Sequence, residues 1–154
     1  MSVSVDVFGE LLTNKVIWTA IFSWAVAQII KVLLELKKTR KFNSALFVSS
    51  GGMPSSHTSF VTAMTMSIGF TERFDSSIFA LSAVFSLVVM YDAAGVRRAA
   101  GNQAAAINMI VKKFEDQGIK LDKKLKELLG HTPIQVAGGA VLGITVAFVS
   151  YYIF

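Results

Sequence analysis

The chain has 154 residues, of which 53% are apolar or aromatic and 16% are charged. With its 11 glycines the apolar share reaches about 60%, against about 45–50% in an average soluble domain, where about 25% of residues are charged. This composition excludes intrinsic disorder, and the absence of cysteine excludes a disulfide scaffold, a thiolate nucleophile and a cysteine zinc site. A chain this short cannot bury so many apolar residues in its own core. The sequence therefore predicts a small polytopic membrane protein.

Four apolar segments define the expected organisation, a single integral-membrane domain over 1–154. The expected spans run over roughly 16–36, 55–71, 76–96 and 132–154. The first is long enough to cross about 30 Å of hydrocarbon as a helix, and the last contains no charged residue. We therefore expect an all-α fold, a membrane helix bundle of about four transmembrane helices.

The long polar stretch 97–131 carries a helical pattern of its own. Ile107, Ile110, Val111 and Phe114 recur at helical spacing. This pattern predicts an amphipathic helix in a cytoplasmic loop, continuing the preceding span.

The basic residues favour one side of the predicted bundle. The formal net charge is +5, and four crossings place 13 of the 15 basic residues at one membrane face. The positive-inside rule then puts both termini outside and the loops 37–54 and 97–131 in the cytoplasm of a bacterial-type inner membrane or its equivalent. This distribution explains the net charge without a nucleic-acid partner. The 13 residues are Lys31, Lys37, Lys38, Arg40, Lys41, Arg97, Arg98, Lys112, Lys113, Lys120, Lys123, Lys124 and Lys126.

Polar residues within or beside the apolar segments gather at the same depth on this cytoplasmic side. Ionisable groups in a membrane are costly, so a function is a fair expectation for the set. For Lys31 or Asp92 singly, structural pairing is an equal alternative, such as Lys31 with Glu35 or with Asp92. The set comprises Gln28, Lys31, Glu35, His57, Asp92, Arg97, Arg98 and His131.

Two predicted helix N-termini point at this level. Ser55 or Ser56 can cap the second helix, and Thr132 can cap the last, with Pro133 at its first position. Free N–H groups and the positive dipole ends of two helices would then meet beside two histidines and Lys31, which suits a phosphate. The simpler alternative, that these residues only start helices, does not explain a histidine at each.

The motifs resemble a known family. Pro54-Ser-Ser-His57 resembles the Pro-Ser-Gly-His motif of the type 2 phosphatidic acid phosphatases, relatives of the vanadium haloperoxidases, and the string from His131 to Gln135 resembles their last motif. The strings 91–104 (YDAAGVRRAAGNQA) and 128–139 (LLGHTPIQVAGG) are similar to a divergent branch of that superfamily. The resemblance runs from Gln28 onward.

The resemblance implies roles for individual residues. His131 matches the nucleophile that forms a phosphohistidine, and His57 matches the general acid for the departing alcohol. Ser56 stands at the glycine of the second motif, where its backbone N–H would face phosphate, and Lys31 matches the lysine of the first motif. The family's phosphatase chemistry is metal-independent, so we expect no cofactor and no metal.

Two departures from the family pattern affect the expected site. Gln135 replaces an aspartate that would orient the nucleophilic ring, although its side-chain oxygen can still accept the ring N–H. Asp92 is a candidate to supply a carboxylate from the third span. The family's arginine just ahead of the last histidine is missing, so Arg97 or Arg98 must substitute for it.

Three functions remain open at this stage. The first is a phosphohydrolase acting on a phosphomonoester or diphosphate, with a lipid-linked substrate. The second is a non-catalytic protein that binds or transports an anionic phospholipid, and the third is a structural subunit. The expected partners are the lipid bilayer and a phosphate-bearing lipid; the sequence defines neither the substrate nor the oligomeric state.

Overall fold

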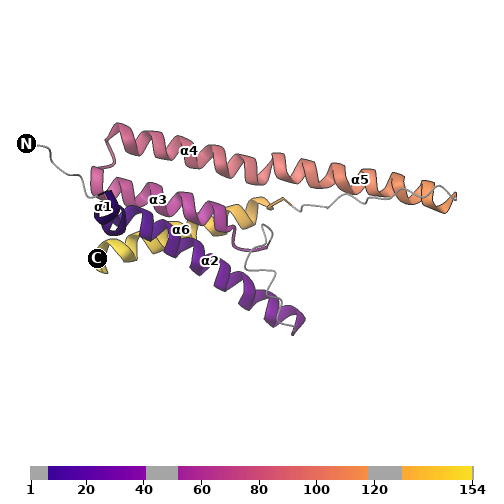
Figure 1. Cartoon of the computed structure of the whole chain (residues 1–154), viewed down its shortest axis with the longest axis horizontal. Coiled ribbons are helices and arrows are strands. Elements are labelled where there is room, and N and C mark those ends of the chain that lie inside the picture. Colours follow the sequence, from indigo (N-terminus) through magenta and orange to yellow (C-terminus); the bar gives the residue numbers. More distant parts are fainter. Residues whose placement is uncertain (1–6, 41–51, 118–129, 154) are drawn as a thin grey trace, which may run out of the picture.

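A computed structural model describes residues 7–40, 52–117 and 130–153 (Figure 1). Within these ranges the regular structure is helical, which confirms the predicted all-α class. The helices are α1 (Val7–Thr13), α2 (Lys15–Thr39), α3 (Ser56–Glu72), α4 (Ser77–Ala94), α5 (Val96–Asp116) and α6 (Pro133–Ile153).

Side-chain caps set where the long helices begin. Asn14, Ser55 and Ser76 each accept a hydrogen bond from the backbone N–H three residues on, and so cap α2, α3 and α4. At the other end of α2, Arg40 takes a left-handed conformation with φ of 54° and donates its N–H to the carbonyl of Leu36. Helices α2, α3, α4 and α6 therefore occupy the four expected segments to within three residues.

Helix α3 is the centre of the bundle and packs against α2, α4 and α6. Two of its buried hydroxyl residues form hydrogen bonds with neighbouring helices. The hydroxyl oxygens of Ser59 and Ser23 (α2) are 2.6 Å apart, and those of Thr65 and Ser86 (α4) are 2.7 Å apart. Small hydroxyl residues are favoured between membrane helices because they allow close approach and add interhelical hydrogen bonds.

Glycines bring α6 directly onto α3. A Cβ on Gly143 would lie 2.6 Å from the carbonyl oxygen of Ser59, and one on Gly139 would overlap the carbonyl oxygen of Ser55. Only glycine fits at these two contacts. The start of α6 is thereby fixed against the start of α3.

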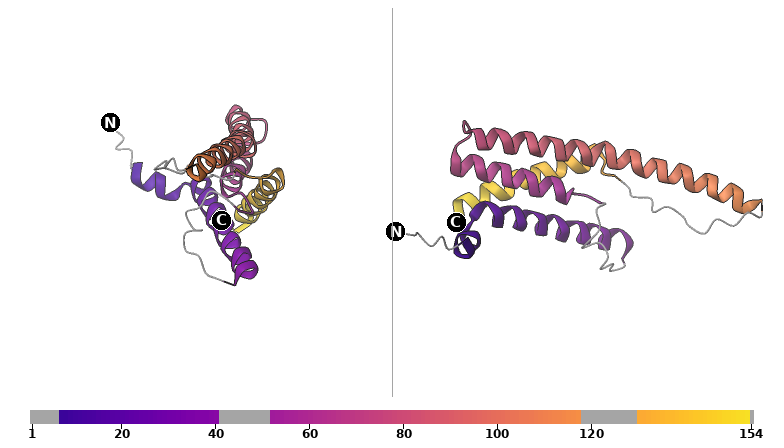
Figure 2. Two further views of the ribbon diagram at one scale, coloured as in Figure 1. Left: turned by 90° about the vertical axis from the view of Figure 1, so that its right-hand side faces the viewer. Right: turned by 45° about the horizontal axis from the view of Figure 1, so that its top comes forward.

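Helix α5 continues α4 beyond Gly95 and extends past the other helices, as two views show (Figures 1 and 2). The predicted amphipathic helix over this stretch is confirmed. Its apolar side chains are largely exposed, with Ile110 at 54% and Phe114 at 43%. Residues 118–129, which contain four of the lysines predicted in the cytoplasmic loop, lie outside the described residues.

Three stretches of the described chain are long and apolar enough to cross a membrane: α2, the continuous α4–α5 and α6. Large apolar side chains such as Leu81 and Val141 are more than 60% exposed on the bundle surface. Water would disfavour this surface, whereas lipid would solvate it. Central α3 has 17 residues, a length of about 26 Å. That α3 forms a fourth crossing remains a prediction.

Candidate functional site

The two histidines come together at one end of the bundle. His57 lies in the first turn of α3, and His131 immediately precedes α6. Their ring centroids are 6.5 Å apart, with the ring planes inclined by 59°. His131 is only 2% exposed, whereas His57 is partly exposed. The proximity expected from their common membrane depth is therefore present in the fold.

The N-termini of α3 and α6 meet beside these rings. Ser55, one of the two serines predicted to cap the second span, is the N-cap of α3. Thr132 Oγ1 accepts the N–H of Gln135 at 3.4 Å, and Pro133 is the first residue of α6, as predicted. The Ser55 N–H donates to the carbonyl of Gln135 at 3.0 Å, which ties the two ends together. Two positive helix ends thus converge on the histidines, an arrangement that favours an anion.

Two hydrogen bonds hold His131 in place, and a third holds its partner Gln135. Its backbone N–H donates to the carbonyl of Ala93, in the last turn of α4, at 3.1 Å. Its ring Nδ1 lies 3.3 Å from Oε1 of Gln135, and the same oxygen accepts the N–H of Thr132 at 3.0 Å.

These contacts select one tautomer of the neutral His131 ring. The Thr132 N–H can only donate, so the Gln135 atom facing it must be the amide oxygen. That oxygen can only accept, so His131 Nδ1 carries the proton and donates it. The lone pair is then on Nε2, which is also buried. Gln135 Oε1 therefore accepts the ring N–H, as the sequence allowed, and brings no charge.

Lys31 brings a cation to the same end of the bundle. The residue is 3% exposed on α2, and its Nζ lies 3.5 Å from Oγ of Ser56 at the start of α3. Gly52, with φ of +94°, lies against the lysine stem, and a Cβ there would approach Lys31 Cγ to 2.9 Å. This glycine leaves room for the stem and directs the amine toward α3.

The contacts of the other predicted site residues are less well defined. Asp92 is half-buried in the last turn of α4, next to the Ala93 carbonyl that holds His131. Arg97 and Arg98 belong to the first turn of α5, at the same end of the bundle; their side chains are outside the description.

Comparison with known proteins places the chain in a family. A model of the "Divergent PAP2 family" matches residues 12–146, most of the chain. The chain belongs to this family. It is 43% identical to "Uncharacterized membrane protein YuiD" of Bacillus subtilis (strain 168), in an alignment that covers 94% of this chain and 99% of that protein. No solved structure matches the chain. Family membership, the relative's description and the apolar helices together make this an integral membrane protein.

Some contributors to the site of this divergent PAP2 protein were not identified from the sequence. Gly52 gave no signal beyond a glycine-rich loop, because its role depends on the position of α2. The sequence contains no signal for the Ala93 carbonyl either, because every residue has a backbone carbonyl and residue type does not mark which one is used. Thr58 is fully buried, and its Oγ1 donates to Ser55 Oγ at 3.0 Å. In the sequence, only its position next to the Pro54–His57 motif indicated that it belongs to the site.

Within residues 7–40, 52–117 and 130–153, no group of three His, Cys, Asp or Glu side chains could hold a metal ion. The site as described offers imidazoles, a lysine and helix N-termini, which are groups that bind and transfer phosphate.

Proposed function

We propose that this divergent PAP2 protein is an integral-membrane phosphohydrolase. It removes phosphate from a phosphomonoester or diphosphate, with a lipid-linked substrate, through a phosphohistidine on His131. The observation that carries the proposal is the approach of the His131 and His57 rings, with centroids 6.5 Å apart, at the place where two helix N-termini meet.

In the first step, the Nε2 lone pair of His131 attacks phosphorus, and the bond from phosphorus to the leaving oxygen breaks. His57, in its protonated form, gives its proton to that oxygen, which departs as an alcohol or a phosphate. Gln135 accepts the Nδ1–H of the ring as positive charge develops on it. In the second step, water attacks phosphorus, the N–P bond breaks, and the water proton passes to His57. Histidine suits both roles because its ordinary titration lies near neutral pH.

Charge neutralisation falls to the cations and the helix ends. Lys31 and the backbone N–H groups following Ser55 and Thr132 would bind the non-transferring phosphate oxygens. Ser56, beside the Lys31 amine, is the proposed hydroxyl contact. Arg97 or Arg98 would approach from the start of α5, and Asp92 is the nearby carboxylate proposed to support the charged ring.

The proposed orientation follows from charge. The end of the bundle that holds the histidines also receives Lys37 and Lys38 of α2, and α5 extends from it. By the positive-inside rule this end faces the cytoplasm, with four crossings and both termini outside. Protease accessibility of tags at the two termini in sealed cells tests this orientation: cleavage from outside supports it, and protection contradicts it.

The activity is tested with purified protein in detergent and a panel containing phosphatidic acid, lysophosphatidic acid and an isoprenyl diphosphate. Wild type should release inorganic phosphate from at least one of them. His131→Ala and His57→Ala should lose that release, and Gln103→Ala, an exposed change on α5, should retain it. Equal inactivity of wild type and His131→Ala across the panel would contradict the proposal.

One observation favours a second function. Because Gln135 carries no charge, the site also suits binding or transport of an anionic phospholipid without chemistry. In that case His131→Ala would leave headgroup binding nearly intact, whereas Lys31→Gln would weaken it. Lipid binding to both variants, measured beside phosphate release, separates the two functions.

A further inference from the structure

Two adjoining cavities lie at the end of the bundle opposite the histidines. Their volumes are about 420 Å³ and 480 Å³, and both are lined by Lys15, Thr19 and Ser150. Along α3, Thr71 at the first cavity is 14 residues from His57, a rise of about 21 Å. These cavities are therefore separate from the site proposed above.

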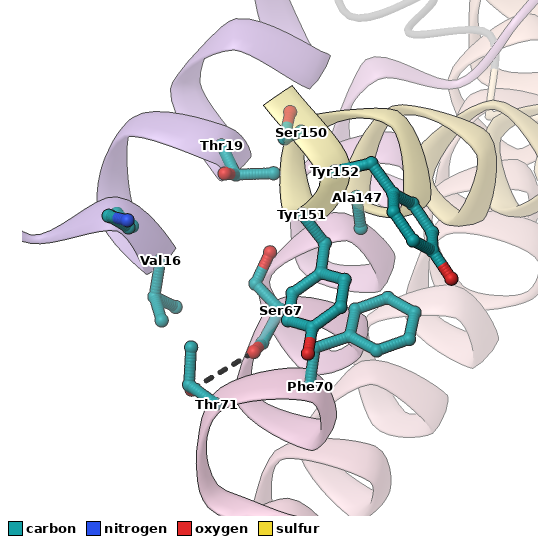
Figure 3. A pocket seen from close by; sticks show the side chains of 10 residues that line it. Val16, Thr19, Ser67, Phe70, Thr71, Ala147, Ser150, Tyr151 and Tyr152 are labelled. Carbon is teal, nitrogen blue, oxygen red and sulfur yellow. Dashed lines mark hydrogen bonds between the residues drawn. The ribbon is translucent and has the colours of Figure 1, made fainter. Parts of the chain in front are cut away.

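The first cavity is polar on one wall and aromatic on another, and α2, α3 and α6 surround it (Figure 3). The hydroxyl residues Thr19, Ser67 and Ser150 line it and are 7–8% exposed, so they are more than nine-tenths buried. The rings of Phe70 and Tyr151 also line it and stack on each other, with centroids 4.8 Å apart. Buried hydroxyls and a lysine together suit the oxygens of a phosphate.

The second cavity is mainly apolar. Leu12, Trp18 and Phe22 line it, and the indole Nε1 of Trp18 donates to the carbonyl of Leu12 at 2.9 Å. This bond fixes the ring against the end of α1. The space it borders is suited to a hydrocarbon chain, and it adjoins the polar cavity at the three shared lining residues.

The depth of these cavities also matches a lipid. Trp18, Tyr151 and Tyr152 line them, and Phe74 extends the aromatic cluster at the same end. Trp and Tyr gather where a membrane meets water, which is the level of phospholipid headgroups. A polar cavity with a lysine at that level, adjoining an apolar one, matches the two parts of a single lipid.

We propose that the paired cavities bind an anionic phospholipid of the leaflet opposite the histidine site. Its phosphate lies between Lys15 and the hydroxyls of Thr19, Ser67 and Ser150. One acyl chain follows Trp18 and Phe22 along α2. A second copy of the chain or a free anion would use only one of the two cavities, whereas a phospholipid fills both.

Quenching of Trp18 fluorescence tests the proposal. Trp18 and Trp24 are the two tryptophans of the chain, so Trp24→Phe leaves Trp18 as the only reporter. The full-length variant in detergent micelles is titrated with phosphatidylglycerol or phosphatidylcholine, each carrying brominated acyl chains. We expect saturable quenching, with phosphatidylglycerol bound more tightly.

In the same background, Lys15→Gln should weaken phosphatidylglycerol binding about fivefold and leave phosphatidylcholine binding unchanged. Thr19→Val removes a hydroxyl at nearly constant volume and should weaken it about threefold. Lys113→Gln, the same charge change on exposed α5, is the control and should have no effect. Equal affinity for the two lipids, or equal effects of Lys15→Gln and Lys113→Gln, would overturn the proposal. Circular dichroism verifies that each variant retains its helices.

Discussion

Replacing Gln135 by glutamate tests the histidine chemistry with the exchange of one side-chain NH₂ group for an oxygen. In the structure, Oε1 of Gln135 is 3.3 Å from Nδ1 of His131 and 3.0 Å from the backbone nitrogen of Thr132. Glutamate has the same length and keeps an acceptor for both donors. What changes is the charge beside the ring that becomes cationic when phosphate is transferred to it.

The size of the effect follows from that hydrogen bond. A bond between neutral groups contributes about 0.5–1.5 kcal/mol and one to a charged group about 1.5–3 kcal/mol. The glutamate should therefore stabilise the transition state by about 1–2 kcal/mol more than the amide does. This corresponds to a rate increase of about five- to thirtyfold.

Phosphate release by purified protein, measured for all variants at the pH at which wild type is fastest, measures this increase. Gln135→Met, of similar shape but without the acceptor oxygen, should lower the rate below that of wild type. Gln103→Glu on α5 is the matched control for added charge and should leave the rate unchanged. If Gln135→Glu is no faster than wild type while its thermal unfolding is unaltered, the orienting and charge-stabilising role assigned to residue 135 is refuted.

Three further predictions concern positions away from the reacting rings. Gly52→Ala forces a side chain into a left-handed conformation against the stem of Lys31. The displaced amine should reduce phosphate release about tenfold. An unchanged rate would contradict the role of Lys31 in the site. Gly143→Ala places a Cβ 2.6 Å from the Ser59 carbonyl oxygen and should cost about 1–3 kcal/mol, seen as earlier thermal unfolding in detergent. At the exposed turn between α3 and α4, the neighbouring arginine guanidinium lowers the pKa of Asp75. That pair contributes stability above the ordinary carboxyl pKa and loses it as the pH falls through the lowered pKa; Asp75→Asn should therefore remove a small stabilisation at pH 7 and none at pH 2, by thermal unfolding at both values.

The sequence predicted the helices well because length and hydropathy are local properties. The last apolar segment begins as a helix one residue after its predicted start, because Thr132 and Pro133 form a strong helix start. The continuation of α4 into α5 was also readable, because the pattern of Ile107 and Ile110 extends the preceding helix.

Contacts between helices could not be predicted from the sequence to the same degree. The Ser- and Thr-rich sequence of α3 does not show that Ser59 and Thr65 are buried, and it does not identify Ser23 and Ser86 as their partners. Pairing of two hydroxyls requires the helices to be placed relative to one another, and many pairs of small residues would satisfy the same pattern. The central position of α3 emerged only from the fold.

The candidate site was predicted from the sequence less completely than the helices but better than the contacts between them. Common membrane depth predicted that His57 and His131 would approach each other, and the chemistry of an amide predicted that Gln135 would accept the ring N–H. The choice of tautomer required the Thr132 N–H, whose direction is a property of the folded backbone. The anchoring of His131 to Ala93 depends likewise on how α4 ends beside α6.

The most direct test of the phosphohistidine proposal is an experimental structure of the full chain with orthovanadate, which mimics phosphate during transfer. The account predicts vanadium bonded to Nε2 of His131, with His57 and the Lys31 amine within hydrogen-bonding distance of its oxygens and Nδ1 still donating to Gln135. Vanadate bound elsewhere on the bundle, or a His131 ring turned so that Nδ1 faces the vanadium, would contradict it.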